Sequence, residues 1–364
     1  MKLLSYLKRK FAVPIVFVLV FMTLFSCGKK NAYENGELYV YNWGEYIDPE
    51  VIEMFEKEYG IKVIYDMFET NEEMYPIIEM GSVNYDVVCP SDYMITKMKD
   101  NNLLLPINKE LIPNLKNIEK DQMEILKQID EKNEYTVPYM VGTVGILYNE
   151  TLLKEKNLPA PKKWADVFTD TYKNELLMIN SVRDAMMVAL KKNGHSANSV
   201  NPAELDKAID DLKNQKQYVQ AYVVDQAKDK MIGGEAAIAV VYSGDILYVL
   251  NESDNDEYTF KYVLPEEGTN VWIDAWVIPK TAKNVENANK WMDFMCRPEI
   301  AKLNSEYIGY ETPNEEAKKL LDDDHKLTAP TLIDLTNNNN EIFVYLGLDG
   351  EEEYNKRWKE LKSE

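Results

Sequence analysis

From residue 37 onward the chain alternates between short apolar runs and longer segments that carry helix-start and helix-stop residues. The run at 62–68 has the length of a strand, whereas residues 49–59 begin with proline and end just before Gly60. The same order of strand and helix recurs over residues 144–304. Such alternation predicts an α/β fold in which mainly parallel sheets are flanked by helices.

The length of the chain points to more than one folding unit. A domain usually has roughly 100–200 residues, so 364 residues predict two domains. Besides Cys27 the chain has Cys89 and Cys296, both in apolar segments where thiols usually serve as inert packing groups. The spacing of these cysteines fits neither a disulfide framework nor a metal site, and we expect no metal.

Residues 1–27 resemble a targeting signal. Four basic residues precede the apolar run 11–26, which is short for a membrane span and leads into the sequence LFSC. This ending is similar to a bacterial lipobox, in which Cys27 becomes the acylated first residue of the mature protein. A plain signal peptide with an incidental cysteine is the alternative. Residues 28–36 then form a polar tether.

The chain is strongly acidic, with 41 basic and 62 acidic residues and a formal charge of −21. A negative surface repels the phosphate backbone of nucleic acids and attracts cations over a long range. We therefore expect no nucleic-acid partner.

Polar and aromatic residues gather where the predicted strands end. Ligands of open α/β sheets bind beyond the carboxyl ends of strands. Every such stretch carries a carboxylate, and four of the five carry an aromatic ring. The stretches are NWGEY (42–46), PSDY (90–93), NSVRD (180–184), YSGD (242–245) and WIDAW (272–276).

Several carboxylates and aromatic faces, without an evident Lys or Arg, suit an extended organic cation. Carboxylates supply charge-assisted hydrogen bonds to ammonium groups, and aromatic faces cover methylenes and attract cations. Burial of four methylenes contributes about 3 kcal/mol, at about 0.8 kcal/mol each, while micromolar binding needs about 8 kcal/mol. The carboxylates must therefore carry much of the affinity.

Catalytic alternatives find less support in the sequence. His195 and His325 lie far apart in polar segments, and neither a glycine-rich phosphate loop nor a nucleophile elbow is present. Two carboxylates could serve a glycosidase, but nothing distinguishes a general acid from a nucleophile. We expect a binding protein without catalytic residues, and an extracellular hydrolase stays as an alternative.

Five segments together resemble the polyamine-binding proteins of bacterial ABC transporters, the spermidine/putrescine class of type 2 periplasmic binding proteins. These segments are LYVYNWGEYIDPEVIEMFEKEYGIKVIYDMFETNEEMYPII (38–78), YDVVCPSDYMITKM (85–98), GTVGILYN (142–149), WIDAWVIPK (272–280) and IGYETPN (308–314). They follow the order of the family, and the resemblance extends over nearly the whole chain after the tether.

The resemblance implies two α/β lobes that close on a ligand through crossing hinge segments. Lobe one would comprise residues 37–140 and 272–309, and lobe two residues 141–271 and 310–364. The crossings would lie near 139–145, 271–274 and 308–312.

The resemblance also implies where the protein works and with which partners. A monomer without a cofactor would capture putrescine or spermidine outside the cytoplasm, in the periplasmic space or on the outer face of the cytoplasmic membrane. It would be anchored there by its N-terminal lipid. It would then deliver the ligand to a permease and its ATPase.

The family's ligand site carries over onto specific positions of this chain. The aromatic walls would be Trp43, Tyr46, Tyr93, Tyr242, Trp272 and Tyr310. The carboxylates that meet the amines would be Glu45, Asp184, Asp245 and Asp274, with Ser91 as a lesser contact. Of these, Asp274 is the strongest candidate for an ammonium partner.

The sequence departs from the spermidine-preferring members at several positions. Ser181 replaces the first of two acids, Tyr242 replaces a tryptophan, and Phe343 stands where a glutamine is expected. These changes favour a shorter diamine as the ligand, or binding of both putrescine and spermidine.

Other interpretations of these positions stay open. Asp184 could instead form a capping box with Ser181, and Asp245 could favour a helix N-terminus through the helix dipole. A sugar or ferric iron is the alternative ligand.

Overall fold

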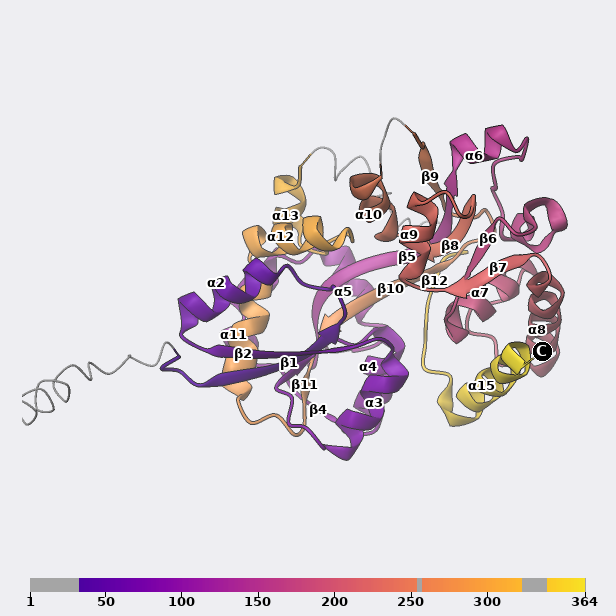
Figure 1. Ribbon diagram of the computed structural model, residues 1–364. Coiled ribbons are helices and arrows are strands. Elements are labelled where there is room, and N and C mark those ends of the chain that lie inside the picture. The colour runs from indigo at the N-terminus through magenta and orange to yellow at the C-terminus, as the bar shows by residue number, and fades with distance from the viewer. Residues whose placement is uncertain (1–32, 254–256, 323–338, 364) are drawn as a thin grey trace, which may run out of the picture.

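The computed structural model describes residues 33–253, 257–322 and 339–363, which form two groups of elements around separate sheets (Figure 1). The predicted lipidation site, Cys27, lies outside the described residues. Strand β1 (Glu37–Trp43) belongs to the first group, and the long strand β5 (Val137–Asn149) runs from the first group into the second.

The first group is built on a parallel sheet in the order β2-β1-β3. Strand β2 (Lys62–Phe68) pairs with β1 along its length, and β3 (Val87–Val88) pairs on the other side. A bridge from Val88 to Val277 links this sheet to the short pair β4 (Leu104–Leu105) and β11 (Ile278–Pro279).

The helices of the first group begin and end at the residues that the sequence indicates. In α2 (Pro49–Tyr59) the Asp48 carboxylate accepts a hydrogen bond from the Glu50 amide, and Gly60 ends the helix with a φ of 61°. Thr70 caps α3 in the same way, through the Glu73 amide. The other helices and 3-10 turns are α3 (Asn71–Met80), α4 (Asp92–Asp100), η1 (Lys109–Leu111), η2 (Pro113–Asn117), α5 (Lys120–Leu126), α11 (Val285–Met295), α12 (Pro298–Ile308) and α13 (Glu315–Leu320).

The second group contains a seven-stranded sheet whose main path is β12-β10-β5-β8-β6-β7, with β9 paired to β5. Strand β5 runs antiparallel to β10, β8 and β9, whereas the β6-β7, β6-β8 and β10-β12 pairs are parallel. The sheet is therefore mixed rather than mainly parallel. The strands are β6 (Leu176–Ile179), β7 (Val219–Val223), β8 (Ile238–Tyr242), β9 (Phe260–Val263), β10 (Asn270–Trp276) and β12 (Glu341–Ile342).

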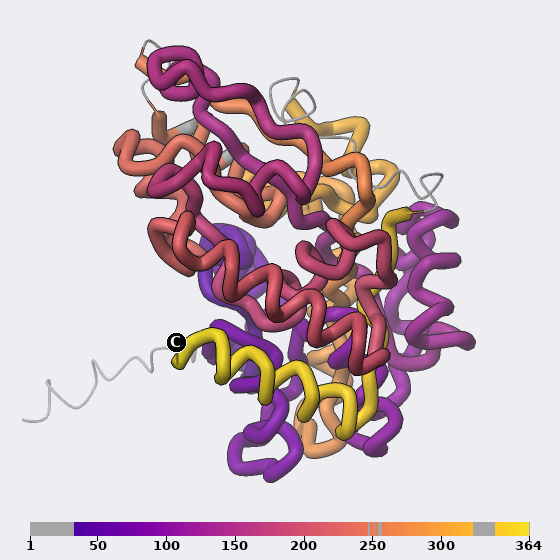
Figure 2. The backbone as a smooth tube through the Cα atoms, turned by 90° about the vertical axis from the view of Figure 1, so that its right-hand side faces the viewer, coloured from indigo at the N-terminus to yellow at the C-terminus, as the bar shows by residue number. Residues whose placement is uncertain are grey.

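Helices cover this second sheet as the alternation predicts. The last helix, α15 (Gly347–Ser363), packs along α8 and α7, and Figure 2 shows it on the outside of the group. The others are α6 (Glu150–Glu155), η3 (Trp164–Phe168), η4 (Asp170–Tyr172), α7 (Val182–Lys192), α8 (Pro202–Lys216), α9 (Gln226–Ile232) and α10 (Asp245–Glu252).

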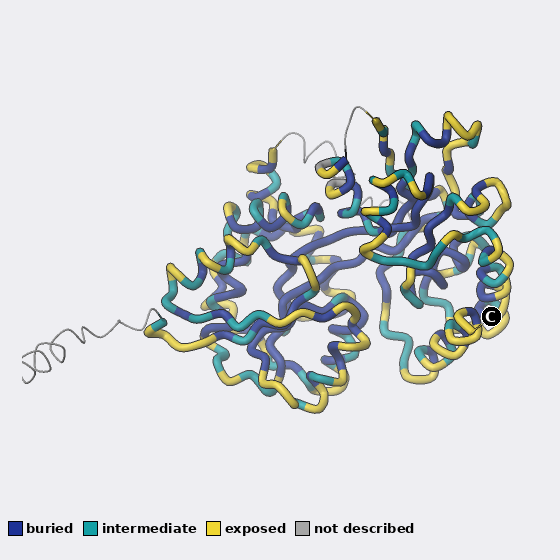
Figure 3. Tube along the Cα trace, in the orientation of Figure 1, coloured by how far each residue is buried: buried dark blue, intermediate teal, exposed yellow. Residues whose placement is uncertain are grey.

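Strands β5 and β10 connect the two groups and are almost completely buried (Figure 3). Beside them, the Val141 amide donates to the Glu311 carbonyl at 3.0 Å. The chain then returns to the first group, because α13 packs on α12 and Asn314 bridges to Ile118. The expected start of the second lobe at residue 310 is therefore too early. The next described residues, around β12, join the second group.

Candidate ligand site between the two sheets

Asp274 is a buried carboxylate with one oxygen available. It lies in β10, where only 5% of its surface is exposed, and its Oδ2 accepts a hydrogen bond from the Tyr46 hydroxyl at 2.8 Å. Ser91, which faces Asp274 across a bridge, also hydrogen-bonds to it. Within the described part of the chain, Oδ1 of Asp274 is buried without a partner.

Burial raises the pKa of Asp274 to about 7, and the hydrogen bonds from Ser91 and Tyr46 act in the opposite direction. A buried acceptor without a donor is costly, and an ammonium ligand would remove that cost. The Tyr46 ring is itself held in place, since the Tyr139 hydroxyl and the Asn42 amide both donate to the Tyr46 carbonyl.

Asp184 is the second buried carboxylate of the site. The Tyr242 hydroxyl donates to its Oδ2 at 2.9 Å, and the Asn270 amide donates to its Oδ1 at 3.3 Å. Burial raises the pKa of Asp184, while the hydrogen bonds from Ser181 and Tyr242 oppose this. The Ser181 hydroxyl also accepts from the Asp184 amide at 3.4 Å. The capping interaction and a carboxylate aimed at Tyr242 therefore occur together.

Four of the predicted aromatic residues form a continuous series of edge contacts. Trp272 lies 4.9 Å from Tyr310 and 6.4 Å from Tyr242, measured between ring centroids. Tyr310 lies 5.8 Å from Tyr46. Because Trp272 and Asp274 are two residues apart on one strand, they share a face of the sheet. The rings and the carboxylate are thereby brought to one place.

Trp43 and Tyr93 contact other partners. Trp43 packs on Phe68 at 4.5 Å between ring centroids. The Tyr93 hydroxyl donates to Glu72 at 2.9 Å, and the Tyr93 ring lies 5.3 Å from the guanidinium carbon of Arg183.

Arg183 was not anticipated as part of the site. Its guanidinium carbon lies 4.4 Å from the Phe343 ring and 5.5 Å from the Tyr354 ring, and the side chain is almost entirely buried. Phe343, the residue found in place of the expected glutamine, is thus covered by a cation of the protein.

Glu45 and Asp225 share a lysine. The ammonium of Lys228, in α9, lies 3.7 Å from Glu45 Oε2 and 3.7 Å from Asp225 Oδ1. Burial raises the pKa of Asp245 to about 7, against the opposing effect of Lys228. The expectation of a site without Lys or Arg is therefore wrong.

Lys228 and Asn270 are residues that sequence reasoning missed. Lys228 belongs to the short helix α9, outside the five stretches at the predicted strand ends, and no local pattern distinguishes it from solvent-exposed lysines. Asn270 precedes the Trp272 motif by two residues, so strand alternation places its side chain on the same face. That signal was available.

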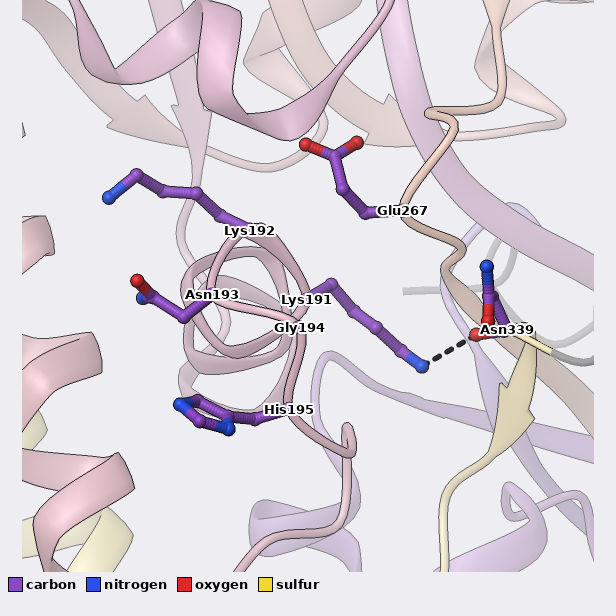
Figure 4. Close-up of a pocket in the computed structure, with 7 residues that line it drawn as sticks. All are labelled: Lys191, Lys192, Asn193, Gly194, His195, Glu267 and Asn339. Carbon is purple, nitrogen blue, oxygen red and sulfur yellow. Dashed lines mark hydrogen bonds between the residues drawn. The ribbon is translucent and has the colours of Figure 1, made fainter.

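A separate cavity of about 440 Å³ lies at the C-terminal end of α7 (Figure 4). Its lysines are compensated, because Lys191 bonds to the Asn339 carbonyl oxygen and pairs with Glu341, and Lys192 pairs with Asp211 at 2.7 Å. It shares no residue with the predicted ligand set. The lining residues are Lys191, Lys192, Asn193, Gly194, His195, Glu267 and Asn339.

Among the described residues, the acids, histidines and cysteines form no cluster of three that could bind a metal ion. No helix in this described part of the chain combines the length and apolar character needed to cross a bilayer.

Buried carboxylates and aromatic rings gathered between two α/β sheets define a solute-binding protein with the type II periplasmic fold, as expected. Residues 50–330 match the family described as bacterial extracellular solute-binding protein, and the chain belongs to that family.

Individual relatives support this assignment. A spermidine/putrescine-binding periplasmic protein of Salmonella typhimurium is 36% identical over 292 residues, which cover 80% of this chain and 81% of the relative. A putrescine-binding periplasmic protein of Pseudomonas aeruginosa is 32% identical, with coverage of 81% and 83%.

The fold is also similar to that of a solved relative. The structure of a spermidine/putrescine ABC transporter substrate-binding protein from Streptococcus pneumoniae matches with a TM-score of 0.76 and 37% identity. The match covers 90% of this chain and 99% of the other.

Proposed function

We propose that this protein captures polyamines outside the cytoplasm and delivers them to an ABC-type transporter, without turnover of the ligand. The observation that carries the proposal is the buried Asp274 carboxylate, whose Oδ1 has no partner among the described residues, together with the nearby rings of Trp272 and Tyr310. A polyamine would supply an ammonium to the carboxylate and methylenes to the rings. The names of the relatives in Salmonella and Pseudomonas point to the same ligands.

The proposed site uses the residues expected from the sequence. Asp274 and Asp184 would bind ammonium groups, with Glu45 and Asp245 adding negative charge. Ser91 would orient Asp274. The aromatic walls would be Trp43, Tyr46, Tyr93, Tyr242, Trp272 and Tyr310.

The two groups of elements would act as lobes that close on the ligand. Lobe one would comprise residues 37–140 and 272–309 together with α13, because α13 packs on α12. Lobe two would comprise residues 141–271 and the part of the chain from β12 onward. The buried strands β5 and β10 would form the hinge, because they are the described strands that run between the groups.

The proposed location is the periplasmic space or the outer face of the cytoplasmic membrane, with a lipid on Cys27 as the anchor. The protein would act as a monomer beside a permease and its ATPase. Replacing Cys27 by serine should move the mature protein from the membrane fraction to the soluble fraction. Retention of the variant in the membrane would contradict the anchor.

Isothermal titration calorimetry of the chain from residue 28 tests which class of ligand the protein binds. We expect putrescine, cadaverine, spermidine or spermine to bind with micromolar or tighter affinity, about 8 kcal/mol or more. Maltose and ferric citrate are the comparison ligands. Binding of either of these, with no amine tighter than millimolar, would overturn the proposal.

A further inference from the structure

Lys228 places a protein ammonium among the carboxylates of the site. Its Nζ lies 3.7 Å from Glu45 Oε2 and 3.7 Å from Asp225 Oδ1, and 4.7 Å from the centre of the Tyr248 ring. The side chain is only 14% exposed, whereas that of Glu45 is 79% exposed. The carboxylates of Glu45, Asp225 and Asp245 all attract this ammonium, and the Tyr248 ring lies beside it. A ligand amine would need a similar environment.

The lysine is held in its charged form. Burial acts to lower the pKa of Lys228, but the carboxylates of Asp245, Asp225 and Glu45 outweigh it, so that the pKa lies above its usual value. A protonated lysine compensates the nearby acids at neutral pH. It also repels any ligand ammonium that approaches the same carboxylates.

The other two carboxylates of the site have neutral partners. Asp274 accepts from Tyr46 and Ser91, and Asp184 accepts from Tyr242 and Asn270. Neither pair involves a lysine. Asp184 and Asp274 therefore accept hydrogen bonds from neutral groups, whereas Glu45 already pairs with a lysine.

We propose that Lys228 determines ligand selectivity: by pairing with Glu45 and placing a positive charge at this end of the site, it leaves Asp184 and Asp274 for two ligand ammonium groups and disfavours a third. This inference rests on the proposed function and names diamines, rather than triamines, as the preferred class. Selectivity of this kind arises from a repulsive element as much as from an attractive one.

The test compares the dissociation constants of putrescine and spermidine for the wild type and for Lys228→Gln. We expect the glutamine variant to increase the affinity for spermidine, relative to that for putrescine, by about tenfold or more. The reason is that the third ammonium of spermidine then meets carboxylates that no lysine compensates. Lys228→Arg, which keeps the charge, should retain the wild-type ratio. Lys228→Met serves as a second neutral variant in case the glutamine disturbs folding.

Lys97→Gln is the matched control. Lys97 also joins the two groups of elements, through an ion pair with Glu351 at 2.8 Å, but it lies outside the carboxylate set. Its loss should change both affinities by the same factor.

An unchanged spermidine-to-putrescine ratio in both neutral variants would overturn the selectivity role while leaving amine binding intact. Failure of the wild type to bind any amine would instead overturn the proposed function itself.

Discussion

At the scale of single residues, Asp274 differs from Asp184 because one of its oxygens is buried without a donor in the described part of the chain. The resemblance to the polyamine-binding family singled out this residue from the sequence. The geometry that makes it important, the Tyr46 and Ser91 hydrogen bonds, joins residues more than 180 positions apart.

Replacing Asp274 by asparagine should weaken amine binding by more than about tenfold, because a hydrogen bond to a charged group contributes roughly 1.5–3 kcal/mol. Calorimetry with putrescine measures the loss. Asp293→Asn is the matched control, since Asp293 is also buried and accepts hydrogen bonds from Asn114 but lies on α11. Equal affinity of the two variants would remove Asp274 from the site.

The pH dependence of ligand binding should follow the titration of the Asp274 and Asp245 carboxyls. Burial raises the pKa of each from 3.8 to about 7. Between these pH values the folded state holds protons that the unfolded state has lost. Each group therefore lowers stability as pH rises through that window, and the effect is constant above it.

A bound ammonium favours the charged carboxylates, so the increase in melting temperature caused by putrescine should be larger at about pH 8 than at about pH 5. Binding near neutral pH should also release protons, which calorimetry in buffers of different ionisation enthalpy detects. Asp274→Asn should reduce both effects. A ligand-induced stabilisation that grows toward low pH would contradict this assignment.

At the scale of elements, the pairing of β5 with β10 positions the indole of Trp272. Gly142 is opposite Trp272 in this pair, and a Cβ at residue 142 would come within 2.2 Å of the indole Cζ2. The Trp272 position thus depends on a glycine of the neighbouring strand.

Gly142→Ala should therefore destabilise the fold by roughly 1–3 kcal/mol, as overpacked interiors do, and displace the indole. Denaturant unfolding and tryptophan fluorescence measure the two effects. Trp272→Phe removes the atoms that the new methyl group would meet, so the double variant should lose less stability than the sum of the single variants. Strict additivity would show that the clash is relieved elsewhere.

The sequence pattern could not predict the direction of the strands in the second sheet. The alternation of strand and helix over residues 144–304 suggests mainly parallel neighbours. In the structure β5 instead runs antiparallel to β8 and β10, because the chain uses it to pass between the two groups of elements. A local pattern of period two is the same for both directions.

At the scale of the whole molecule, ion pairs join the two groups at separate places. Lys97, on α4, pairs with Glu351 of α15, and Lys228, on α9, pairs with Glu45 of the first group. Contacts of this type favour an arrangement in which the groups lie close together.

Lys97→Gln should shift the ligand-free protein toward a more open arrangement, with a larger radius of gyration in X-ray scattering. Putrescine should reduce that radius again, because the ligand binds residues of both groups. Lys302→Gln is the control, since Lys302 pairs with Glu306 within α12. A radius that changes equally in the two variants would exclude Lys97 as a closure contact.

The sequence by itself determined the α/β class, the start and end of the helix at 49–59, and the composition of a site for a cationic ligand. These features depend on local periodicity and side-chain chemistry, which the order of residues carries directly. Tertiary structure decided which charges meet. Lys228 meets Glu45, and Arg183 meets the Tyr93 ring, only because separate elements pack together, and no local pattern encodes these contacts. Whether an acid awaits a ligand or is already paired is therefore a property of the folded molecule.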